Sequence, residues 1–217
     1  MLRILILAGM AVGLGVASEA GAEEARKRFG APAQAFAISD AAQKIFPEMP
    51  ALKLVPDVYA HCGAAAGVNP QMAYCTSDNT IYYRVDTDHA AHEAYALAHL
   101  YGHAVQVRHG VADVALRQIT RRRDEEGQLR AWVEQQVDCI AGVLFRIARL
   151  PRTDLRALYA EEPMTDRHWG RNPLSQGPVA SAGFAARAAW FDVGQRGNLS
   201  ACAVGEFGSD LLLRAMR

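Results

Sequence analysis

Two histidines, His99 and His103, are separated by one helical turn in the sequence AHLYGH. In a helix this spacing places both side chains on one side, so their imidazoles can bind the same metal ion. Gly102 lies between them and would let a neighbouring element approach closely. A metal site with two histidines also needs a third protein ligand.

Glu134 and Asp138 are the candidates for completing such a site, because they too are four residues apart on one helical face. A buried carboxylate is costly without a partner. A metal ion would satisfy Glu134, and Asp138 could then accept a hydrogen bond from a ligand histidine and fix its tautomer. Taken alone, each pair is equally compatible with a hydrogen-bonded core or a solvated face. The four residues together strengthen the metal interpretation, because each pair explains the other, and the metal-free interpretation stays open beside it.

The position that would activate water is occupied by an apolar residue. In zinc hydrolases with an H-E-x-x-H helix, the glutamate after the first histidine is the general base. Here that residue is Leu100. His92 and Glu93 lie two turns earlier, about 10 Å away at 1.5 Å per residue, and the Tyr101 phenol is a poor base near neutral pH. A base from a distant loop stays open.

Three helices are expected around these residues. The first spans about residues 88–107, with N-cap candidates before it and Gly110 after it. The second spans about 124–150, carries an apolar stripe of helical period and ends at Pro151. The third covers 182–194, with Trp190 and Phe191 packed inward. Helices with so many apolar residues should be largely buried.

The rest of the chain has weaker signals. Residues 80–85 are β-branched and aromatic and follow the turn-like sequence SDN, which predicts a strand. Residues 63–70 and 163–178 read as loops. The segment 35–56 contains three prolines, and we expect it to pack irregularly. We therefore divide the chain into residues 1–22, an N-terminal leader and irregular segment at 23–58, and one domain at 59–217.

Residues 1–22 have the pattern of a secretory signal peptide. Arg3 is followed by the apolar run 4–17 and by the small-residue cleavage pattern AGA. The run is shorter than the ~20 residues of a membrane span, so we expect cleavage, no remaining transmembrane helix, and a periplasmic or secreted protein. A membrane anchor is the alternative.

Charge and cysteine content limit the other possibilities. Lys plus Arg and Asp plus Glu each number 23, so no basic excess indicates nucleic-acid binding. The run 121–123 of three arginines is neutralised by the acidic residues that follow it.

Four cysteines in an exported chain suggest two disulfides. Of three possible pairings we favour Cys62–Cys75 and Cys139–Cys202, with free buried thiols as the alternative.

Four stretches match motifs that occur together in one family. Residues 72–83 are similar to F-Y-C-P-x-D-x-x-I-Y, and 95–106 to A-Y-V-I-A-H-E-V-G-H-H-V-Q. Residues 134–143 are similar to E-L-Q-A-D-C-x-A-G-V, and 187–191 with Cys202 to R-x-x-W-F and a closing cysteine. In this order and spacing, over about residues 59–207, the chain resembles the neutral zinc metallopeptidases of bacteria, a zincin-like family.

The resemblance implies a fold and a site. The fold would be α+β, mainly helical, with a small sheet beside the metal-bearing helices. His99, His103 and Glu134 would bind one zinc ion, and Asp138 would support a ligand histidine. The cysteines match the family's positions. Two features depart from the family: Leu100 replaces its catalytic glutamate, and residues 179–183 lack the histidine of its T-H-G stretch.

Together these features predict an exported metallopeptidase homologue that binds zinc but is impaired in peptide hydrolysis. Such a pseudo-peptidase would have a binding or regulatory role, with a peptide or protein as candidate partner. One alternative is an active peptidase that takes its base from elsewhere. The other is a metal-free structural or partner-binding module.

Overall fold

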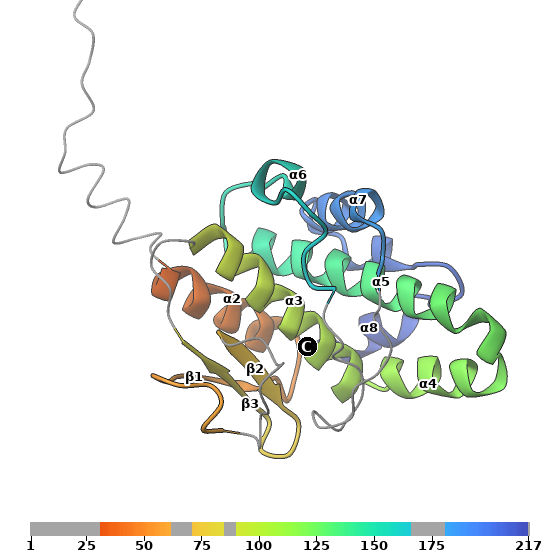
Figure 1. The fold of residues 1–217 in the computed structure, drawn as a ribbon, viewed down its shortest axis with the longest axis horizontal. Coiled ribbons are helices and arrows are strands. Elements are labelled where there is room, and N and C mark those ends of the chain that lie inside the picture. Colours follow the sequence, from red (N-terminus) through yellow and green to blue (C-terminus); the bar gives the residue numbers. More distant parts are fainter. Residues whose placement is uncertain (1–30, 62–70, 85–89, 166–180, 217) are drawn as a thin grey trace, which may run out of the picture.

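The fold is built around two packed helices, α3 (Ala90–Arg108) and α5 (Glu126–Ile147). The computed structural model describes residues 31–61, 71–84, 90–165 and 181–216 (Figure 1). In Figure 1 the sheet lies on one side of α3, whereas α5 and α7 (Phe184–Gly194) lie on the other. Helix α5 is buried along most of its length because it packs against both α3 and α7. The expected α+β, zincin-like fold class is confirmed.

All three predicted helices are present. Helix α5 is preceded by the 3-10 turn η2 (Arg123–Glu125) and ends before Pro151. Helix α7 begins two residues later than predicted, with Phe191 buried and Trp190 partly buried against the core. The N-cap candidates of α3 at 86–88 and the predicted loop at 63–70 lie outside the described residues, as does most of the loop predicted at 163–178.

Irregular packing of residues 35–56 was a wrong prediction. Residues Ala31–Ile45 form helix α2, which packs against α3. Its alanines favour a helix, and Pro32 lies in the first turn, where proline is tolerated. The three prolines that suggested irregularity all lie beyond the end of α2. Strand β1 (Ala51–Leu54) fits between the last two of them.

The sheet has three short strands in the order β1-β3-β2. Strands β2 (Met72–Cys75) and β3 (Thr80–Tyr83) form an antiparallel hairpin, and β1 pairs with β3 in parallel. The strand predicted at 80–85 is therefore confirmed for residues 80–83, Arg84 lies just beyond the strand, and residue 85 is outside the described residues. Strand β1 is at the edge, where a nearby proline interrupts no ladder.

Shorter elements complete the fold. Helix α4 (Val111–Arg121), which the sequence analysis did not identify, packs its buried face on α5. The short helices are α6 (Leu155–Leu158), η3 (Leu199–Cys202) and α8 (Asp210–Ala215). Arg122 pairs with Glu125 at 3.0 Å, which is the local neutralisation expected for the arginine run. Among the described residues, no helix has the length and apolarity to cross a membrane.

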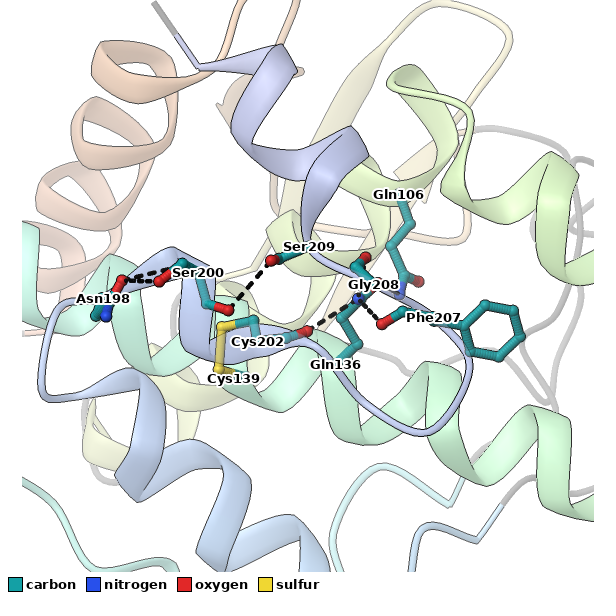
Figure 2. Close-up of a disulfide and its surroundings, with 9 residues drawn as sticks. All are labelled: Gln106, Gln136, Cys139, Asn198, Ser200, Cys202, Phe207, Gly208 and Ser209. Atoms are coloured by element: carbon teal, nitrogen blue, oxygen red, sulfur yellow. Dashed lines mark hydrogen bonds between the residues drawn. A yellow bond between two sulfur atoms is a disulfide. The ribbon is translucent and has the colours of Figure 1, made fainter.

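A disulfide joins the C-terminal tail to α5 (Figure 2). It links Cys139 and Cys202, which confirms one predicted pairing. The Gln136 amide, also on α5, donates to the backbone carbonyls of Cys202 at 2.9 Å and Phe207 at 3.3 Å. The tail is thus held by a covalent bond and by one buried amide.

Only one cysteine of the second predicted disulfide lies among the described residues. Cys75 is disulfide-bonded, but Cys62 lies outside the described residues. The Cys62–Cys75 pairing stays a prediction.

Candidate metal centre

The two histidines of α3 face one another across a single helical turn. His103 Nε2 lies 3.1 Å from His99 Nε2, and the ring centroids are 4.8 Å apart. His99 is 2% exposed, whereas the His103 side chain is 20% exposed. The pair therefore opens to solvent on the His103 side.

Helix α5 brings a carboxylate to the same point. Glu134 Oε2 lies 3.3 Å from His99 Nε2, and Glu134 Oε1 lies 3.5 Å from His103 Nε2. This approach depends on Gly102, because a Cβ there would lie 2.9 Å from both Cγ1 and the carbonyl oxygen of Val137 on α5. The close contact expected at Gly102 is confirmed.

Asp138 lies one turn further along α5 and contacts His99 from behind. Its Oδ1 accepts a hydrogen bond from His99 Nδ1 at 3.0 Å and from the Tyr95 hydroxyl at 2.7 Å. A proton held at Nδ1 leaves the lone pair of a neutral His99 at Nε2, which is the atom that faces His103 and Glu134. The structure thus gives Asp138 the geometry that fixes a tautomer.

Arg187 is a member of this cluster that the sequence analysis left without a role. It lies on α7 and is fully buried. Its Nη1 donates to both carboxylate oxygens of Asp138 at 3.0 Å, and its Nη2 lies 3.5 Å from Glu134 Oε2. The available signal was one arginine among the apolar residues of the first two turns of α7. An arginine at such a position needs a buried carboxylate as a partner.

Electrostatics favour the charged forms in this cluster despite its burial. Burial lowers the pKa of His99, but hydrogen bonds to Asp138 and Glu134 outweigh it, so the pKa is raised. Burial raises the pKa of Glu134, but the positive charge of His103 and the hydrogen bond from His99 outweigh it. The pKa of Glu134 is therefore held well below its usual range. Glu134 is a carboxylate at any ordinary pH.

The donor set fits a divalent metal. Tetrahedral zinc with bonds of about 2.1 Å has ligand atoms about 3.4 Å apart. His99 Nε2 lies 3.1 Å from His103 Nε2 and 3.3 Å from Glu134 Oε2, and His103 Nε2 lies 3.5 Å from Glu134 Oε1, so each histidine faces a different carboxylate oxygen at a distance near that value. Among the described residues, His99, His103 and Glu134 form a group able to hold a metal ion. Two imidazoles and a carboxylate are also the donor types that zinc hydrolases use.

No side chain named as a substitute base points to this centre. Leu100 is half-buried and packs against the main core. The Tyr101 hydroxyl donates to Ser39 Oγ and to the Pro50 carbonyl.

The two residues two turns earlier are also engaged at other places. Glu93 accepts a hydrogen bond from the Tyr83 hydroxyl, and His92 Nε2 contacts the Leu158 carbonyl oxygen. Other residues that could act as a base, Asp166, His168 and those of the segment 85–89, lie outside the described residues, so a base from a distant loop stays an open alternative.

Two packed helices that converge two histidines and a glutamate beside a small sheet define a zincin-like protein with a candidate metal site. The chain belongs to the family described as "Putative neutral zinc metallopeptidase", whose profile matches residues 34–204. This match confirms the family that the four sequence motifs indicated. No curated protein and no solved structure matches the chain.

Proposed function

We propose that this chain is an exported, zinc-binding member of its family in which peptide hydrolysis is impaired. The site then acts in binding a peptide or protein, or in regulation. One observation carries the proposal: Leu100 follows the first histidine of an otherwise converged donor set. His99, His103 and Glu134 are the proposed zinc ligands, and Asp138 orients His99.

The size of the impairment follows from the missing proton acceptor. General acid–base help typically contributes about 10²–10⁴ in rate. A bound zinc ion would still polarise a carbonyl group and acidify its water. Leu100, however, can neither accept a proton from that water nor pass one to a leaving amine. The protein therefore retains the groups that bind and orient, and lacks the group that transfers the proton.

Metal content and a gain-of-activity variant test this proposal together. The mature, oxidised protein should contain about one zinc per chain, and His103→Ala should lose it. Leu100→Glu should raise cleavage of a peptide library by about 10²–10⁴. Leu100→Gln introduces a side chain of nearly the same shape as glutamate but without its charge, so it should give no gain in cleavage.

The alternatives are distinguished by the same measurements. Robust cleavage by the wild-type protein that chelators abolish would identify a base from elsewhere and overturn the impairment. If the wild-type protein contains no zinc, zinc binding is overturned and the alternative of a metal-free structural or partner-binding module remains.

Export has its own support and its own test. The signal-peptide pattern at 1–22 lies outside the described residues, and the Cys139–Cys202 disulfide suits an oxidising compartment. N-terminal sequencing of the protein from an envelope fraction should begin near Glu23. Finding the uncleaved chain, with residues 1–22 still attached, in the cytoplasm would overturn the proposal of export.

A further inference from the structure

The Glu162 carboxylate, between α6 and α7, is fixed by several donors. Its Oε2 accepts from Ser181 Oγ at 2.6 Å, and its Oε1 accepts from the backbone N–H groups of Ala182 at 2.9 Å and Gly183 at 3.0 Å. These donors directly precede α7, where an anion also interacts favourably with the helix dipole. Glu162 is therefore held in a defined position relative to the start of α7.

Arg187, one turn into α7, extends from this carboxylate to the candidate metal centre. Its Nε lies 3.4 Å from Glu162 Oε1, and its other two nitrogens face Asp138 and Glu134. The guanidinium is planar and rigid, so a change in its contact with Glu162 changes its position at the other two carboxylates. Each nitrogen of the group thus faces a different carboxylate.

We propose that Glu162 is a positioning residue of the metal centre and acts on Glu134 through Arg187. The inference rests on the proposed metal binding. Glu134 Oε2 is shared between His99 Nε2 at 3.3 Å and Arg187 Nη2 at 3.5 Å. Glu162 draws the guanidinium away from Glu134 and so leaves that oxygen available to a metal.

Without the charge of Glu162, Arg187 has two carboxylates left, and both belong to the centre. The guanidinium then moves towards Glu134 and competes with the metal for Oε2. The result is an altered ligand geometry and a weaker site, although Glu162 itself contacts neither histidine. Outer residues of this kind typically change metal affinity by about 10–100-fold.

Glu162→Gln tests the inference in the full mature protein, with Co²⁺ as the spectroscopic probe. The variant keeps an oxygen acceptor for the backbone N–H groups and removes the charge. We expect changed visible d–d bands and about tenfold weaker Zn²⁺ binding, with Glu162→Asp restoring part of both. Glu161→Gln, at an exposed neighbouring position, should behave as the wild type does.

The possible results separate the inference from the proposed function. If the wild-type protein takes up Co²⁺ and Glu162→Gln keeps the same spectrum and affinity, the inference is overturned and metal binding stands. If the wild-type protein takes up no metal, the proposed function fails and the inference fails with it.

Discussion

Gly102→Ala should weaken metal binding in a protein that still folds. The added Cβ would lie 2.9 Å from two atoms of Val137, and ordinary contact begins near 3.4 Å. Helices α3 and α5 must therefore separate locally by about 0.5 Å, the difference between these distances. Overpacking of this kind costs about 1–3 kcal/mol, and the better helix propensity of alanine offsets about 1 kcal/mol. The net loss of stability is at most about 2 kcal/mol.

The same separation of α3 and α5 also changes the geometry of the metal centre. The distance between the two imidazole nitrogens lies within α3 and is unchanged, whereas both distances to Glu134 cross the helix pair and lengthen. Metal–ligand distances in a well-formed site lie within about 0.2 Å of their standard values, and a displacement of about 0.5 Å exceeds that range. We therefore expect zinc affinity to fall at least about tenfold, the lower end of the effect of disturbing outer residues.

The measurement is a zinc titration against a chromophoric chelator, with urea unfolding of the metal-free protein. Gly127→Ala on α5 is the matched control, because its added Cβ meets no atom within 4 Å. It should keep full affinity and gain up to about 1 kcal/mol of stability. A Gly102→Ala protein that binds zinc as tightly as the wild type would refute the role assigned to this helix contact.

Three further changes test the framework around the site. Removing the Cys139–Cys202 disulfide, which closes a separation of 63 residues, should cost about 4 kcal/mol of unfolding free energy; a midpoint unaffected by reductant would contradict this. Gly194→Ala places a Cβ 1.9 Å from the Cys139 carbonyl oxygen and should cost about 3 kcal/mol or more, measured by thermal unfolding; near-wild-type stability would contradict the α5–α7 contact. Burial raises the pKa of Tyr101 from 10.0 to about 12, so above pH 10 the unfolded chain loses a proton that the folded chain keeps, and stability falls between about pH 10 and 12 by at most about 2.7 kcal/mol. Tyr101→Phe should be less stable near pH 8, because two hydrogen bonds are lost, and should show a shallower alkaline decline; parallel stability curves for the two proteins would show that Tyr101 does not cause it.

The sequence predicts the parts of this fold that local signals define. Helix α5 has apolar periodicity, helix α3 has mainly small or apolar residues, and both have clear breakers after their ends, whereas residues 80–83 have the side chains of a strand. Helix α2 was missed because prolines beyond its end were counted against it. Helix α4 was not predicted, although its buried positions Val111, Ala115 and Ile119 have helical spacing.

The residues of the candidate site also divide into those that local spacing predicts and those that it does not. His99 with His103, and Glu134 with Asp138, are pairs on single helices, so spacing alone reveals which residues share a face. Arg187 and Glu162 reach the cluster only through the packing of α7 on α5. That packing depends on Gly142 and Gly194, whose added Cβ atoms would clash with the facing helix. Spacing along the chain carries no information about such a contact.

The charges and packing around the site also bear on the proposal that this chain binds a metal without a catalytic carboxylate at position 100. Glu134, Asp138 and Glu162 supply three negative charges around the single guanidinium of Arg187, which leaves two in excess for a divalent cation. Removing Glu134 or Asp138, which are both buried, would break a charge-paired network, a change that typically costs about 3–5 kcal/mol. Leu100 instead packs against the apolar core, so exchanging a carboxylate for leucine there takes a charge out of a half-buried position and disrupts no partner. The fold thus constrains Glu134 and Asp138 strongly and position 100 weakly, which supports the proposal that metal binding is kept while hydrolysis is impaired.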